Sequence, residues 1–219
     1  MPKQTADDAS FYNRIAHAYD LIADSGESAA RRQGQTALDV QPGEQVLEIG
    51  FGTGHSLMEL ASEVGPRGSV TGLDISTKMA EVARKRRDQT PELASHVRLH
   101  IGDARQLPFE DQQFDAAFSS FTLELFEEAE IPQVIGEVHR VLRKGGRFSL
   151  VTMAQPDDPA HPSRLETAYV WLHEHFPHIV DCRPIIPEPL LEAAGFEISK
   201  SNRIAIWSLP VAIVVATKT

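Results

Sequence analysis

The chain has 219 residues, enough for one α/β domain with a sizeable core. Hydrophobic residues make up 42% and charged residues 24%, which is ordinary for a soluble globular protein. The net charge of −10 argues against a general nucleic-acid binder, because phosphate contacts need a basic surface. The single cysteine, Cys182, cannot form an internal disulfide, and the start of the chain lacks the apolar core of a signal peptide, so we expect a reducing, cytoplasmic compartment.

Two helices are predicted ahead of any strand. The first has an apolar face that comprises Phe11, Ile15, Tyr19 and Ile22. The second covers about residues 27–38. We expect residues 1–40 to form an N-terminal helical lid and residues 41–219 to form the main part of a single structural domain.

The most informative segment is Val-Leu-Glu-Ile-Gly-Phe-Gly-Thr-Gly at 46–54, where a buried-type strand runs into a glycine-rich turn. The turn contains Gly50, Gly52 and Gly54. Glycine allows a sharp turn and a close approach of the backbone to a ligand. A helix pattern begins at His55, so the turn lies between a strand end and a helix start, where α/β folds bind nucleotide-like cofactors. His55 occupies the place of the third glycine of a dinucleotide fingerprint, which weakens a nicotinamide interpretation. Glu48 lies inside the apolar strand, where a carboxylate needs a partner.

Two further strands end in acidic residues. The strand 70–74 ends on Asp74, a carboxylate placed to bind ribose hydroxyls, although it could also cap the next helix, and both roles can coexist. That helix is expected to bury Met79, Val82 and Ala83. The strand that begins at Val97 ends in a turn at Asp103, which suits either contact with an adenine edge or an ordinary turn.

The rest of the chain continues the alternation of strands and helices. The expected elements are a strand at 114–120, a helix at about 132–142, a strand at 148–152, a short helix at 188–194, and strands at about 196–206 and 209–217. Alternation of this kind predicts a parallel sheet with right-handed crossovers. The last two strands are joined too tightly for a crossover, so the final strand must be antiparallel.

Together with Val-Leu-Arg-Lys-Gly-Gly at 141–146, these motifs resemble the class I S-adenosylmethionine-dependent methyltransferases, and they are most similar to the ubiquinone/menaquinone C-methyltransferase branch. The resemblance spans roughly residues 10–152 at motif level. It implies a Rossmann-like, seven-stranded, mostly parallel sheet with helices on both faces and one antiparallel C-terminal strand, and S-adenosyl-L-methionine as cofactor. The cofactor contacts that it implies are Tyr19, Glu48, Gly50, Gly52, Thr53, Gly54, Asp74, Ile75, Met79, Asp103, Ala104, Ser119 and Ser120.

The acceptor is less well defined. Quinone C-methyltransferases usually carry Arg-Asn after a glycine beyond strand four, whereas this chain has the apolar segment Ser-Phe-Thr-Leu-Glu-Leu-Phe at 120–126. We therefore expect methyl transfer to a small or apolar acceptor, quinol-like or lipid-like. The alternatives are an NAD-dependent oxidoreductase and a non-catalytic cofactor-binding domain. The catalytic candidates are Glu124, His173 and His17, and the acceptor-binding candidates are Phe121, Tyr169, His173 and Arg183.

Other polar clusters have simpler explanations. The histidines at 173–178 do not share one helical face, so no metal site is expected. Basic residues 84–87 suit the solvent face of a helix, and Glu127, Glu128 and Glu130 suit a solvated helix entry. The longest apolar run, 204–216, is too short to cross a bilayer, while peripheral membrane contact stays open.

Overall fold

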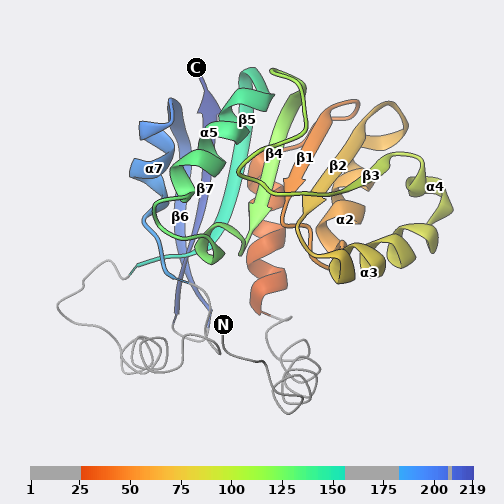
Figure 1. Cartoon of the computed structure of the whole chain (residues 1–219), viewed down its shortest axis with the longest axis horizontal. Helices are drawn as coiled ribbons and strands as arrows, with labels where there is room; N and C mark the ends of the chain where they lie inside the picture. The colour runs from red at the N-terminus through yellow and green to blue at the C-terminus, as the bar shows by residue number, and fades with distance from the viewer. Residues whose placement is uncertain (1–25, 156–182, 207–208) are drawn as a thin grey trace, which may run out of the picture.

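The structure is a computed structural model, which describes residues 26–155, 183–206 and 209–219. Seven strands of this part form one sheet in the order β3-β2-β1-β4-β5-β7-β6 (Figure 1). The strands are β1 (Gln45–Ile49), β2 (Ser69–Asp74), β3 (Val97–Ile101), β4 (Phe114–Ser120), β5 (Leu142–Met153), β6 (Phe196–Ile206) and β7 (Leu209–Lys218). Neighbours are parallel from β3 through β5, and β7 runs antiparallel to both β5 and β6. The predicted fold is therefore confirmed.

Helices cover both faces of the sheet. They are a helix over 26–38, α2 (His55–Val64), α3 (Thr77–Asp88), α4 (Pro91–Ala94), α5 (Ile131–Val141) and α7 (Pro187–Ala193), with short 3-10 turns η1 (Gly65–Arg67) and η2 (Leu123–Leu125). One apolar cluster joins α5 and α7 to one face, and a second joins the helix over 26–38, α2 and α3 to the other (Figure 1). The alternation of Val46 and Leu47 between these clusters follows from the two-residue period of a strand.

The described part of the predicted lid packs directly on the sheet. Ala30 and Leu38 are fully buried in the cluster that contains Phe118 and Val151. Gly34 allows this close approach, because a Cβ built there would lie 2.3 Å from the Val151 Cγ2 atom. Its carbonyl accepts a 2.8 Å hydrogen bond from the Ser149 hydroxyl. The lid over 1–40 stays a prediction, because residues 1–25 lie outside the described part.

The structure differs from expectation in the packing of α3. Ala80 and Ala83 are its buried residues, whereas Met79 and Val82 are 41% and 42% exposed. The reason is close packing against the glycine turn, since a Cβ on Gly54 would lie 2.9 Å from the Ala83 Cβ. Small alanines fit this interface, which leaves Met79 at the surface beside the carboxyl end of the sheet.

Candidate functional site

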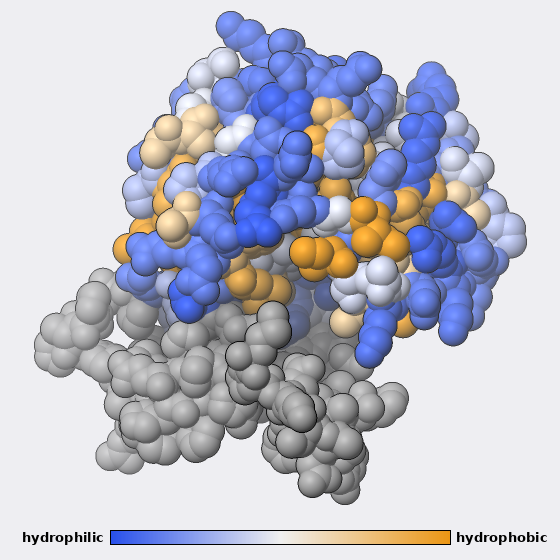
Figure 2. Space-filling view, in the orientation of Figure 1, coloured by the Kyte–Doolittle hydropathy of each residue, from blue (hydrophilic) through white to orange (hydrophobic). Residues whose placement is uncertain are grey.

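A cavity of about 670 Å³ opens at the carboxyl ends of β1, β2, β3 and β4. The chain reverses its direction of winding between β1 and β4, which is where open α/β sheets bind ligands. Figure 2 shows hydrophobic side chains gathered near these strand ends, beside hydrophilic surface. The described residues that line the cavity are Glu27, Arg31, Ile49, Gly50, Phe51, Gly52, Thr53, His55, Ser56, Leu73, Asp74, Ile75, Ser76, Met79, Gly102, Asp103, Ala104, Arg105, Ser120, Phe121, Thr122, Leu125, Phe126 and Glu130.

The glycine turn forms one wall of the cavity. Gly50, Gly52 and Gly54 have φ angles of 71°, 51° and 80°, a region that other residues rarely adopt. Gly50 also lies against Thr122, whose Oγ1 atom would be 2.1 Å from an added Cβ. A Cβ on Gly52 would meet no atom of the described residues within 4 Å, so in this part of the structure the turn leaves open space where a ligand can approach the backbone.

Gly52→Ala should separate ligand contact from backbone strain. Both Gly52 and Gly145 have positive φ, 51° and 75°, and open space at the Cβ position, but Gly145 lies near the start of β5, away from the cavity. We expect each alanine variant to lose about 1 kcal/mol of unfolding free energy in urea titrations. Only Gly52→Ala should weaken binding of S-adenosylhomocysteine in calorimetry. Equal affinities in the two variants would contradict a ligand contact at Gly52.

Asp74 is held rigidly at the end of β2. Its Oδ2 atom accepts from the Gly52 backbone N–H at 2.9 Å, and its Oδ1 atom accepts from the Ser76 N–H at 2.8 Å. Ser76 is the N-cap of α3 and accepts a 3.3 Å hydrogen bond from the Met79 N–H. The capping role considered for Asp74 thus belongs to Ser76, and the Asp74 carboxylate faces the cavity with one acceptor site left on each oxygen.

Asp103, at the end of β3, forms part of an ion-pair group. Arg105 donates to both carboxylate oxygens of Asp103, with its Nη2 atom 2.5 Å from Oδ2, and also pairs with Glu130. The Arg105 hydrogen bonds hold the pKa of Asp103 below its usual value. Glu130 was expected at a solvated helix entry, but it pairs with Arg105 at the cavity wall.

Glu48 lies beneath the cavity rather than in its lining. The side chain is fully buried on the α2 side of β1, where the Ser56 hydroxyl donates to Oε1 and Oε2 has no hydrogen-bond partner among the described residues. Burial raises the pKa of Glu48 to about 8, although the Ser56 hydrogen bond and the charge of Arg31 act in the opposite direction. Ser56 and Arg31 both line the cavity, so a polar end is present beside the glycine turn.

The segment that follows β4 contributes apolar side chains to the cavity wall. They belong to Phe121, Leu125 and Phe126. Leu125 is 58% exposed. Phe121 has a φ of 50°, an outlier for a bulky residue, and such strain tends to occur at functional sites.

Glu124 does not share this exposure. It is 1% exposed and accepts 2.9 Å hydrogen bonds from the Thr152 hydroxyl and the Met153 N–H. Burial raises the pKa of Glu124 to about 7. Its carboxyl group therefore faces the end of β5 and is absent from the cavity lining.

Several predicted site residues lie away from the cavity. Arg183 forms an ion pair with Glu127, and its backbone N–H donates to the Glu124 carbonyl at 2.9 Å. Ser119 is buried and donates to the Ile49 carbonyl at 3.2 Å. Gly54 lies at the start of α2, outside the lining. The predictions for His17, Tyr19, Tyr169 and His173 fall outside the described residues.

Sequence reasoning did not identify four charged residues of the cavity wall, namely Glu27, Arg31, Arg105 and Glu130. Arg105 could have been noticed, because a cation two residues after a strand-end aspartate can fold back onto it. Glu27 and Arg31 come from the helix over 26–38, and Glu130 immediately precedes α5. No local pattern places these charges against a strand end.

In the described part of the chain, no group of three or more histidine, cysteine, aspartate or glutamate side chains has an arrangement that could hold a metal ion. Among the same residues, no helix is long and apolar enough to cross a membrane.

Residues 46–146 match the family model described as a methyltransferase domain. The chain is 35% identical over 153 residues to a demethylmenaquinone methyltransferase of Lactobacillus johnsonii, an alignment that covers 68% of this chain and 61% of that protein. The chain thus spans about three fifths of this relative.

Solved structures share the fold. A S-adenosylmethionine-dependent methyltransferase from Methanosarcina mazei superposes with a TM-score of 0.68 at 23% identity, covering 82% of this chain and 94% of that one. A geranyl diphosphate methyltransferase in complex with S-adenosylmethionine superposes with a TM-score of 0.69 at 18% identity, covering 86% and 85%. At these identities the likeness concerns the fold alone.

Proposed function

Because the chain belongs to the class I S-adenosylmethionine-dependent methyltransferases, we propose that it transfers a methyl group from this cofactor to an apolar acceptor, quinol-like or lipid-like. The observation that supports this most strongly is one cavity whose lining combines polar groups with apolar side chains. The polar groups include the glycine turn and Asp74, and the apolar side chains include Phe121 and Phe126.

The described residues fit the cofactor. Open space at Gly52 would admit a ligand close to the backbone, and Asp74 offers two acceptor sites to a vicinal diol. Arg31 has the charge to hold a carboxylate, and its Nε atom is buried without a hydrogen-bond partner in the part of the chain that the structure describes. Glu48 lies beneath the cavity, and its Oε2 atom, which has no hydrogen-bond partner among the described residues, could accept a hydrogen bond from the ammonium group of the cofactor.

The cofactor supplies an activated methyl group when bound, so the protein has to orient the acceptor and exclude water. Phe121, Leu125 and Phe126 would provide the apolar surface for this task. A quinol acceptor would also need to lose a proton. Of the proposed bases, Glu124 is the one within the described residues, and its carboxyl group lies behind the acceptor wall.

Two acceptor classes follow from this surface. A quinol is favoured by the similarity to demethylmenaquinone methyltransferases. A lipid headgroup is the second candidate, because the segment after β4 lacks the Arg-Asn pair and presents the exposed Leu125 at the cavity.

Methyl transfer can be tested directly with S-adenosylmethionine that carries a labelled methyl group. We expect label in the organic phase with a reduced short-chain demethylmenaquinone, and the parallel assay uses phosphatidylethanolamine vesicles. Leu125→Asp should lower turnover at least tenfold and leave affinity for S-adenosylhomocysteine unchanged, because Leu125 is one of the apolar side chains that line the cavity after β4.

The matched control is Ile186→Asp, which introduces the same charge at a 46% exposed aliphatic residue outside the cavity lining.

Label with the lipid alone would identify the second acceptor class. Cofactor binding without transfer to either acceptor would favour a non-catalytic domain. Binding of NADH in place of S-adenosylhomocysteine would overturn the proposal.

A further inference from the structure

The neighbour of β5 changes beside the cavity. β4 pairs with β5 in parallel, and the Phe121 N–H, just past the end of β4, still donates to the Val151 carbonyl at 2.8 Å. Further along the same edge of β5, the segment 183–185 takes the place of β4. There the Ile185 N–H donates to the Met153 carbonyl at 3.0 Å, and a parallel bridge follows. The backbone N–H of Met153 lies at the change from one neighbour to the other.

Glu124 supplies the hydrogen-bond acceptor at this change. If the parallel ladder continued past β4, the Met153 N–H would donate to the Phe121 carbonyl. It donates instead to the Glu124 Oε1 atom at 2.9 Å, and the Thr152 hydroxyl donates to Oε2 at 2.9 Å. The Glu124 carbonyl accepts from the Arg183 N–H at 2.9 Å. Glu124 therefore joins the segment after β4 both to the end of β5 and to the chain at Arg183.

Phe121 leaves the sheet in a conformation that phenylalanine rarely adopts. Its φ of 50° lies in the left-handed region, which is unfavourable for a residue with a Cβ atom. Two hydrogen bonds to β5, one from the Phe121 N–H and one to the Glu124 side chain, fix the chain on both sides of this conformation. The chain turns out of the sheet at this point, and Phe121 and Leu125 line the cavity.

Resting on the proposed function, we propose that Glu124 is a positioning residue, which replaces the Phe121 carbonyl as the acceptor at β5, holds Phe121 in the left-handed conformation and so fixes the apolar wall for the methyl acceptor. Glu124 is 1% exposed and absent from the cavity lining, so it acts through the backbone of 121–126 and does not touch the acceptor. This role requires two hydrogen bonds from the side chain, whereas a general base requires an ionisable group.

Glu124→Gln and Glu124→Met separate the two roles. The amide oxygen of Glu124→Gln can accept from the Met153 N–H, and its amide nitrogen can donate to the Thr152 hydroxyl. Glu124→Met leaves both donors without this acceptor. In the methyl-transfer assay, we expect Glu124→Met to raise the KM for the methyl acceptor and to lower kcat/KM at least about tenfold, with little change in affinity for S-adenosylhomocysteine. Glu124→Gln should restore most of the lost turnover, whereas a general base would be lost in both variants.

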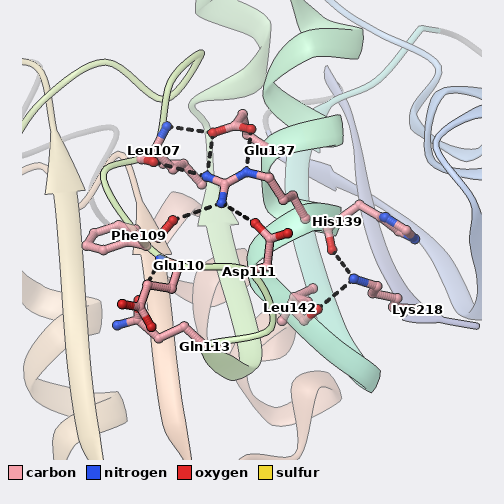
Figure 3. Close-up of polar contacts among 10 residues, drawn as sticks. Leu107, Phe109, Glu110, Asp111, Gln113, Glu137, His139, Leu142 and Lys218 are labelled. Carbon is pink, nitrogen blue, oxygen red and sulfur yellow. Dashed lines mark hydrogen bonds and ion pairs between the residues drawn. The ribbon is translucent and has the colours of Figure 1, made fainter.

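Glu137 offers a matched control at a carboxylate away from the cavity. It accepts from the Leu107 backbone N–H at 2.8 Å and pairs with Arg140 on α5 (Figure 3). Like Glu124, it joins a loop to a neighbouring element, but it does not line the cavity. Glu137→Met should lower the melting temperature and leave the KM for the methyl acceptor at its wild-type value.

The strain at Phe121 can be measured without acceptor or cofactor, by comparing urea unfolding of Phe121→Ala and Phe121→Gly. Both variants remove the ring, but only Phe121→Ala keeps a Cβ atom at positive φ. In the wild-type background, Phe121→Gly should therefore unfold at the higher urea concentration. With Glu124→Met, the backbone can relax to an ordinary conformation, and the order should reverse because glycine loses more chain entropy on folding. Gln112, with a φ of 57° outside the cavity lining, is the control: Gln112→Gly should stay more stable than Gln112→Ala in both backgrounds.

The inference would be overturned by an order of Phe121→Ala and Phe121→Gly that is the same in both backgrounds. Wild-type acceptor kinetics in Glu124→Met would also overturn it, and so would a Glu124→Gln variant as inactive as Glu124→Met. If Glu124→Met does not fold, Thr152→Val, which removes one of the two donors, takes its place in both experiments. Failure of the wild-type chain to methylate either acceptor would count against the proposed function, while the unfolding comparison would still decide the role of Glu124 in the strain at Phe121.

Discussion

Asp74→Ala should weaken binding of S-adenosylhomocysteine by on the order of 2–4 kcal/mol, because it removes charge-assisted hydrogen bonds to two ribose hydroxyls. Each Asp74 oxygen already accepts one backbone N–H, from Gly52 or Ser76, and has one acceptor site left. The carboxylate is therefore held in place before a ligand arrives. Calorimetric titration of the wild-type chain and the variant measures the loss.

The same variant also loses the anchor of the glycine turn, so a ligand control is needed. A 2′,3′-dideoxy analogue should bind the wild-type chain more weakly than S-adenosylhomocysteine, but it should lose little further affinity in Asp74→Ala. Glu81→Ala removes an equal charge from the exposed face of α3 and should leave both affinities unchanged. Undiminished affinity of Asp74→Ala for S-adenosylhomocysteine would exclude the ribose contact.

Glu48→Gln should remove much of the pH dependence of folding stability between about pH 4.5 and pH 8. Burial raises the pKa of Glu48 from 4.5 to about 8, so the folded chain keeps a proton that the unfolded chain releases. The stability contribution of this group is therefore fully present below pH 4.5 and is lost as pH rises towards 8. At about 1.36 kcal/mol per pKa unit, the loss is on the order of 5 kcal/mol in the wild-type chain.

Urea unfolding at pH 5 and pH 8.5 measures this difference. Glutamine retains an oxygen that can accept from Ser56, so the variant should be more stable than the wild-type chain at the higher pH. Glu81→Gln, at an exposed position, should keep the wild-type profile. Glu124, whose pKa is raised to about 7, should add a smaller dependence of the same sign. Parallel stability profiles for the wild-type chain and Glu48→Gln would contradict a buried neutral carboxyl at this position.

Local sequence patterns were sufficient for the fold and for many of the residues that line the cavity. The positive φ angles at Gly50 and Gly52, and the acidic strand ends at Asp74 and Asp103, are local properties. Parallel strands then bring such ends to one edge of the sheet, because all of them point in the same direction. This is why residues more than twenty positions apart could be assigned to one site in advance.

Side-chain orientation and charge pairing were decided only by the tertiary structure. The Glu48 carboxylate faces a buried space under Ser56, although Glu48 lies within β1. The Glu124 carboxylate faces the end of β5, although Glu124 follows β4. The carboxyl ends of β1 and β4 both form part of the cavity. Arg105 pairs with Glu130 across 25 positions of sequence. The sequence by itself determined the order of strands and helices, the glycine turn and the positions of the strand-end acids, because these depend on backbone conformation and on the periodicity of apolar residues. Which charges meet, and which carboxylates are buried, depends on how the helices pack across the sheet. A local sequence pattern carries no information on that packing.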